Sequence, residues 1–184
     1  AAAFLQSDAT HLLFVDGDIG FAPEDVLGLV QRMQADPELV VIGAPCPKRA
    51  VNWNLVASAA TKGLAQGNPA ALERFSGLFT LDLVDPAGQF RLDQPIELKR
   101  VGTGLMLIRR DVIEALVQRH PELRYTADAL DRESGIAGEH LTALFQPMID
   151  PDTGHLLSDD YAFCRRARDA GFRLWLAPWM RTSH

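Results

Sequence analysis

The sequence has few cysteines and no long apolar run, and these shortages exclude several classes of protein. Its two cysteines, Cys46 and Cys164, lie far apart and outside any Cys-x-x-Cys or Cys/His cluster, which excludes a disulfide scaffold. The longest apolar runs, residues 12–15 and 39–42, are far shorter than the ~18 residues of a membrane-spanning helix. No basic segment precedes an apolar one as in a signal peptide. We therefore expect a cytoplasmic protein with two buried thiols and no membrane span.

Positive charge is also scarce. The chain has 18 Lys and Arg against 24 Asp and Glu, a net charge of −6, and its only lysines are Lys48, Lys62 and Lys99. Nothing forms a basic patch large enough to hold a nucleic-acid backbone, so no nucleic-acid partner is expected. An anionic small ligand would need a local device such as a metal ion. The length of 184 residues and the hydrophobic fraction of 47% are typical of one globular domain, residues 1–184, with a real core.

Short apolar runs alternate with segments of helical period. The runs at residues 11–15 and 39–44 predict buried strands, and those at 105–108 and 172–177 predict two further strands. Residues 23–35, 110–119 and 158–170 predict helices. Residues 78–84 and 96–101 predict a small β-hairpin around Asp85–Gly88, while residues 57–75 are ambiguous and 124–153 form a long polar stretch. This alternation predicts an α/β fold with a mostly parallel sheet and flanking helices.

Asp16 and Asp18 directly follow the first predicted strand. Ligands of open α/β sheets bind at this edge, and a spacing of two residues in extended chain points both carboxylates to one side. Two such carboxylates repel each other unless a cation joins them, and a hard divalent ion shares its coordination with substrate phosphates. The pattern predicts a metal and diphosphate site. By itself, Asp-x-Asp also fits a solvated acidic turn.

A second acidic pair, Asp159 and Asp160, follows Ser158 at the start of the last predicted helix. Ser158 or Asp159 can cap that helix, and a structural role as cap or dipole partner is the commoner one for an isolated acid. Asp160 is then left to face the cleft. A carboxylate in that place can act as general base for a hydroxyl group.

Two further segments carry candidate binding residues. Gly102, Thr103 and Gly104 allow close approach of a ligand and offer a hydroxyl, although a tight turn explains them equally well. Lys48 and Arg49 can meet a diphosphate or an anionic acceptor, or lie on the surface. Trp53 fits a sugar platform, a core position or an interface. Weaker candidates for acceptor contacts are scattered through the long polar stretch: Glu139, His140, Asp150, Asp152 and His155.

Three motifs in order resemble the GT-A class of nucleotide-sugar glycosyltransferases. They are Phe14-Val15-Asp16-Gly17-Asp18, the run from Val101 to Arg110, and Ser158-Asp159-Asp160-Tyr161-Ala162-Phe163-Cys164-Arg165-Arg166. The resemblance covers the chain except residues 54–95. It implies a Rossmann-like GT-A sheet, a nucleoside-diphosphate sugar as donor and a Mn²⁺ or Mg²⁺ ion. The class begins with a strand and helix that hold the nucleotide base; no such unit precedes Ala1, so we expect an N-terminally incomplete copy.

The resemblance also implies roles for single residues. Asp16 lies near the donor and, with Asp18, at the metal; a histidine after the last strand often completes the metal ligands in this class, and His184 stands there. Asp160, with Asp159 beside it, supplies the base or a carboxylate that binds the sugar. The acceptor is a carbohydrate or another hydroxyl compound. The sequence selects neither the donor base and sugar, nor inversion or retention, nor the oligomeric state.

Two other functions fit the same residues. One is a nucleotidyltransferase or related phosphate-handling enzyme, which would usually show a glycine-rich basic signature early in the chain. The other is a non-catalytic carbohydrate-binding derivative of the fold. Donor hydrolysis in the presence of Mn²⁺ separates the three: nucleoside diphosphate, pyrophosphate, or no product with retained sugar binding.

Overall fold

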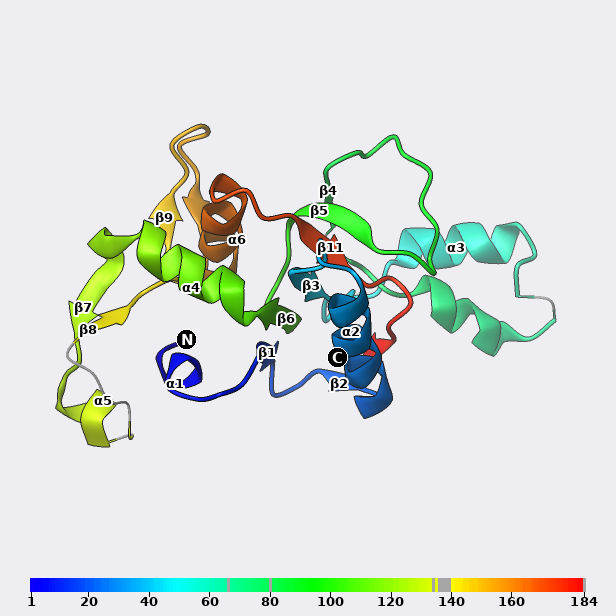
Figure 1. Ribbon diagram of the computed structural model, residues 1–184. Coiled ribbons are helices and arrows are strands. Elements are labelled where there is room, and N and C mark those ends of the chain that lie inside the picture. Colours follow the sequence, from blue (N-terminus) through cyan, green and yellow to red (C-terminus); the bar gives the residue numbers. More distant parts are fainter. Residues whose placement is uncertain (66, 80, 134, 136–139, 184) are drawn as a thin grey trace.

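The fold is built on one six-stranded mixed sheet with helices on both faces (Figure 1). The computed structural model describes residues 1–65, 67–79, 81–133, 135 and 140–183. The strand order in the sheet is β1 (His11–Val15), β6 (Leu105–Arg109), β3 (Val41–Gly43), β11 (Leu174–Leu176), β5 (Ile96–Arg100) and β4 (Asp82–Leu83). The α/β class is therefore confirmed, and β4 with β5 confirms the predicted hairpin in a shorter form.

The prediction of a mostly parallel sheet was wrong. In this sheet, among the residues that the structure describes, only β3 and β11 pair in parallel. The pairs β1–β6, β3–β6, β5–β11 and β4–β5 are antiparallel. The alternation of strand and helix did give β1 and β3 the same direction, because both run opposite to β6. A later strand, β6, lies between them. An alternation of strand and helix predicts that two successive strands run in the same direction. It does not predict whether a later strand is inserted between them, and the antiparallel β6 makes this sheet mixed.

Alternate side chains of the central strands build two separate cores. Met106 and Ile108 point to the face covered by α4 (Arg110–Arg119), α6 (Asp159–Asp169) and α1 (Ala2–Leu5). Leu105 and Leu107 point to the opposite face, covered by α2 (Pro23–Ala35). This period of two matches the pleat of a strand buried on both faces. Helices α2, α4 and α6 form at the residues that their apolar periodicity predicted.

Strand β1 is an edge strand, not the buried strand that its apolar run predicts. Leu12 and Phe14 pack against the core under α4 and α6, whereas Leu13 and Val15 are 36% and 37% exposed. A run that is apolar at every position does not reveal whether a strand is central or lies at the edge, because periodicity carries that information only when one face is polar.

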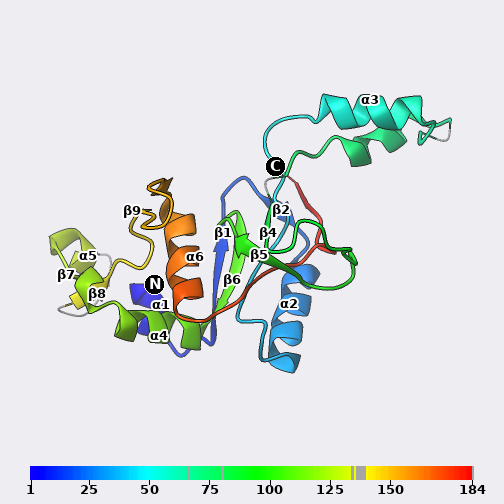
Figure 2. The ribbon, with the colours of Figure 1, turned by 90° about the horizontal axis from the view of Figure 1, so that it is seen from above.

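The smaller elements lie around this sheet. Residues 52–76, which we call the arm, contain α3 (Trp53–Thr61) and η1 (Pro69–Phe75) and project from the body in both views (Figure 2). The short η2 (Pro121–Leu123) precedes the long polar stretch, which holds β7 (Arg124–Thr126), α5 (Ala129–Glu133), β8 (His140–Thr142) and β9 (Met148–Ile149). Strand β9 pairs with β10 (Leu156–Leu157). Finally, β2 (Gly20–Phe21) pairs with β12 (Thr182–Ser183). Within the described residues, no helix has the length and apolar character to cross a bilayer.

The short segment from Val101 to Gly104 joins β5 to β6, although β11 and β3 separate these strands in the sheet. Its first residue, Val101, is buried against β3. A Cβ atom added to Gly43 would come within 2.2 Å of Val101 Cγ1 and 3.1 Å of the Leu105 carbonyl oxygen. A glycine at the end of β3 therefore lets the crossing segment lie directly on the strand.

Replacing Gly43 by alanine should lower the free energy of unfolding by about 1–3 kcal/mol, the usual cost of overpacking a filled core. Gly28 offers a matched control, because it lies within α2 and an added Cβ would meet nothing within 4 Å. Gly28→Ala should raise stability by roughly 0.5–1 kcal/mol through its better helix propensity. Urea unfolding of both variants measures this difference, and equal effects would show that the segment does not press on β3.

The buried thiol of Cys164 fixes the same segment from the helix side. Its Sγ accepts a hydrogen bond from the Val101 amide and donates one to the Val101 carbonyl, both at 3.3 Å. Burial raises the pKa of Cys164 from 9.0 to about 12. Both cysteines are free thiols, but Cys46 is only half-buried, so the prediction of two buried thiols holds for Cys164 alone.

This thiol makes stability depend on pH in the alkaline range. Above pH 9 the unfolded chain loses the Cys164 proton while the folded chain keeps it up to about pH 12, so stability falls as pH rises. The loss is about 1.4 kcal/mol per pH unit for one proton. Guanidinium unfolding at pH 9 and 10 should show this additional loss in the wild type and not in Cys164→Ala. Parallel losses in the two proteins would contradict the assignment.

Candidate functional site

The end of β1, the end of β3 and the beginning of β6 meet at one edge of the sheet. The Asp16 amide donates to the Gly104 carbonyl at 3.0 Å, and the Ala44 amide donates to the Leu105 carbonyl at 3.0 Å. These bonds place the Asp16–Asp18 segment, the Gly102–Gly104 segment and the start of the Cys46–Arg49 loop at the same edge. Strand pairing thus brings together three motifs that are far apart in the sequence.

Asp16 and Asp18 lie in a tight turn, not in the extended chain assumed from their spacing. The Ile19 amide donates to the Asp16 carbonyl at 3.1 Å, and Ile19 is buried beneath the turn. Both aspartates are exposed. The Asp18 carboxylate forms an ion pair with the guanidinium of Arg49, from the loop after β3.

The residues present fit a divalent cation that is shared with a substrate. Asp18 already holds a cationic group at its carboxylate oxygen, and Asp16 offers a second exposed carboxylate in the same turn. Mg²⁺ and similar hard ions are commonly bound by one or two carboxylates, with substrate phosphates and water completing the coordination. No group of three or more His, Cys, Asp or Glu side chains suited to a metal is found in the part of the chain that the structure describes. His184, the third expected ligand, lies outside the described residues.

The Gly102–Gly104 segment runs between the two acidic motifs. A Cβ added to Gly104 would lie 3.8 Å from Asp16 Oδ2, and one added to Gly102 would lie 3.6 Å from Asp160 Oδ2. The two ends of this segment therefore lie beside Asp16 and beside Asp160. Thr103 stands between them and is half-buried. Neither glycine has a side chain that would cover the carboxylate beside it.

Asp160, the predicted base, is half-buried at the beginning of α6. One of its oxygens, Oδ1, accepts hydrogen bonds from the Ser158 hydroxyl and from the Tyr161 amide, the latter at 2.8 Å. The sequence predicted a side-chain cap from Ser158 or Asp159. Ser158 does occupy the N-cap position, but neither side chain forms a capping hydrogen bond. Asp159 is exposed in the first turn, where its charge favours the helix dipole.

A small pocket of about 180 Å³ opens beside the glycine segment. Lys48 lines it together with Cys46, Gly102, Gly104, Arg100 and Tyr161. The sequence reading missed Arg100, which ends β5, forms an ion pair with Asp82 at 2.5 Å and stacks on the Tyr161 ring at 4.7 Å from its centroid. The sequence does indicate Arg100 as a candidate, because Lys99 and Arg100 directly precede the Val101–Gly104 motif.

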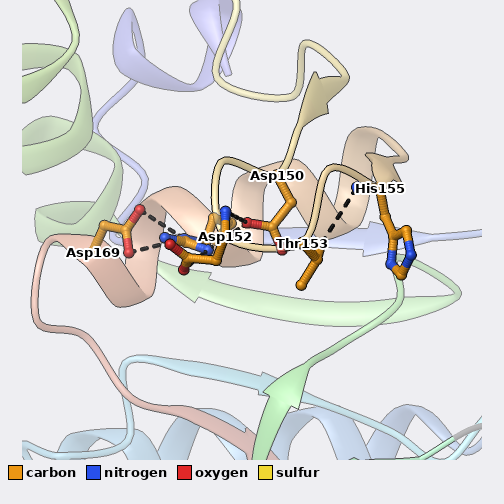
Figure 3. A network of polar contacts seen from close by, with 6 residues as sticks. Asp150, Asp152, Thr153, His155 and Asp169 are labelled. Atoms are coloured by element: carbon orange, nitrogen blue, oxygen red, sulfur yellow. Dashed lines mark hydrogen bonds and ion pairs between the residues drawn. The ribbon is translucent and has the colours of Figure 1, made fainter.

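A larger pocket of about 540 Å³ adjoins the small one, and Arg100 and Tyr161 line both. Its other walls come from the β9–β10 hairpin and from α6. Arg165 of α6 holds that hairpin, because its guanidinium contacts Asp150 at 2.7 Å and Asp152 at 2.8 Å, and it also contacts Asp169 of α6 at 2.9 Å. Figure 3 shows these three aspartates gathered together. Asp150 also accepts a hydrogen bond from the Thr153 hydroxyl at 2.9 Å.

The weaker candidates separate clearly. Arg165 binds both Asp150 and Asp152, and of these two only Asp150 lines the larger pocket, together with His155. Trp53 is 71% exposed at the beginning of α3 in the arm. His140 begins β8, and Glu139 lies outside the described residues.

Comparison of the chain with protein-family models and with curated proteins found no match. The chemistry of the site is therefore inferred from the residues described above.

Proposed function

We propose that the protein is a metal-dependent glycosyltransferase of the GT-A class, which transfers a sugar from a nucleoside-diphosphate sugar to an acceptor hydroxyl. One observation supports this most strongly. The Gly102–Gly104 backbone lies with Asp16 at one end and Asp160 at the other. An acidic turn that can hold a metal ion and a separate carboxylate, joined by a segment with a glycine at each end, suits transfer from a diphosphate donor to a hydroxyl.

Asp18 and Asp16 would hold Mn²⁺ or Mg²⁺, which supplies positive charge to the diphosphate leaving group. The Arg49 guanidinium forms an ion pair with Asp18, and it would move to the diphosphate when the Asp18 carboxylate binds the metal ion. Lys48 lines the small pocket and would add a second positive charge for the diphosphate. These residues bind and orient the donor, and they balance its charge in a protein whose net charge is −6.

Asp160 would act on the acceptor. Its Oδ1 is held by Ser158 and Tyr161, so the carboxylate has a fixed orientation with Oδ2 toward Gly102. In an inverting reaction Oδ2 would take the proton of the acceptor hydroxyl, as the acceptor oxygen bonds to the anomeric carbon and the bond from that carbon to the diphosphate breaks, which releases the nucleoside diphosphate. The half-buried position near the glycine segment suits this role better than the exposed position of Asp159.

The test is incubation with UDP- and GDP-sugars in the presence of Mn²⁺, with chromatography of the products. Release of nucleoside diphosphate, lost on chelation with EDTA, is the expected result. Release of pyrophosphate from a nucleoside triphosphate and a sugar phosphate would instead indicate a nucleotidyltransferase. Binding of sugar without release of either product would indicate a non-catalytic derivative of the fold.

A further inference from the structure

The larger pocket is rich in positive charge within an acidic protein. Four cationic side chains line it against two carboxylates, whereas the whole chain has a net charge of −6. The cationic residues are Lys99, Arg100, Arg165 and Arg168, the carboxylates are Asp82 and Asp150, and His155 is also in the lining.

Two of these cations are already neutralised by the protein. Arg100 is held by Asp82 at 2.5 Å, and Arg165 contacts three carboxylates of the hairpin and of α6. Their ion pairs hold the walls of the pocket in place. A ligand that carries a negative group would gain little from either.

The other two cations are available. Lys99 Nζ lies 3.8 Å from Asp82, whose other oxygen already binds Arg100. Arg168 is exposed, and among the described residues no carboxylate lies within ion-pair distance of it. An arginine fork and a lysine in one pocket bind a carboxylate or a phosphate group well, because charge-assisted hydrogen bonds are stronger than neutral ones.

We propose that this pocket binds the acceptor and that the acceptor carries an anionic group, a carboxylate or a phosphate, held by Arg168 and Lys99. This inference rests on the proposed function. Ser158 and Tyr161, the neighbours of Asp160 that hydrogen-bond to its Oδ1, line this pocket, and Tyr161 also lines the small pocket of Lys48 and the glycine segment. Its volume of about 540 Å³ lies in the range of small-molecule sites, which is large enough for one or two sugar rings.

Titration calorimetry without donor or metal tests the binding step, with glucuronate, glucose 6-phosphate and glucose as probes. Either anionic probe should bind at least tenfold more tightly than glucose, and the tighter of the two identifies carboxylate or phosphate. The double variant Arg168→Gln/Lys99→Gln should abolish this preference. The single variant Arg168→Lys, which keeps the positive charge, should retain part of it. Arg119→Gln is the matched control, since Arg119 is likewise exposed in the last turn of a helix.

Nucleoside diphosphate release in the wild type, measured with each probe added, tests the acceptor assignment. The anionic probe should stimulate release more than glucose does. Equal binding of glucose, or equal stimulation by glucose, would overturn the inference while the glycosyltransferase proposal stands. Loss of UDP binding in the Arg168 variant would assign the pocket to the donor and also overturn it. Tight anion binding with no release under any condition would instead refute the proposed function.

Discussion

Asp160→Asn should reduce the rate of sugar transfer about 10²–10⁴-fold, the usual loss when a general base is removed. An amide can still accept the hydrogen bonds of Ser158 and Tyr161, so the side chain should keep its place while it loses the ability to take a proton. The Asp16–Asp18 turn is unchanged by this substitution. Donor binding measured by calorimetry should therefore persist while transfer is lost.

Asp159→Asn is the matched control. Asp159 is the neighbouring carboxylate, exposed and without a capping bond from its side chain, and its charge serves the helix dipole. Transfer should stay near the wild-type rate, with a loss of stability of about 0.3–1 kcal/mol. Loss of transfer in Asp159→Asn together with normal transfer in Asp160→Asn would reverse the roles. Normal transfer in both would mean that no base acts here, as expected of a retaining enzyme.

Asp18→Asn should abolish the dependence of activity on Mn²⁺, together with nearly all of the activity. A neutral amide does not offset the charge of a divalent ion, and Asp18 is the carboxylate that already holds a cationic group in the structure. Calorimetry with Mn²⁺ and a nucleoside diphosphate measures the loss. Asp8→Asn is the control, because Asp8 is exposed in the loop before β1 and its substitution removes the same negative charge from the protein.

A substitution of Arg49 tests the same metal site in a second way. Its guanidinium competes with a metal ion for the Asp18 carboxylate when no nucleotide is present. Arg49→Gln should therefore tighten binding of Mn²⁺ alone and weaken binding of the nucleoside diphosphate. Unchanged Mn²⁺ affinity in both Asp18→Asn and Arg49→Gln would remove this turn from the metal site.

Local patterns in the sequence predicted the elements well and their arrangement less well. Residues 110–119 formed the predicted helix to the residue, because apolar spacing and an acid in the first turn are local signals. The insertion of β6 between β1 and β3 was not predictable in this way, since it depends on the crossing of Val101 over Gly43. That crossing is a contact between residues remote in sequence.

The site shows the same division. Asp16, Asp160 and the glycine segment were identified from their types and from their order along the chain, and the structure brings them together. Their partners were missed: Arg49 on Asp18, and Arg100 on Asp82 and Tyr161. An ion pair between distant segments leaves no local pattern, so charged residues near a motif are candidates whose partners only the fold reveals.

The most direct test of the metal-dependent donor site is a crystal structure with Mn²⁺ and a nucleoside diphosphate, phased so that the anomalous signal locates the ion. The ion should lie at coordination distance from Asp18, bridged to the diphosphate, with Arg49 moved off the carboxylate. An intact Asp18–Arg49 pair with the nucleotide bound away from the Asp16–Asp18 turn would contradict the account.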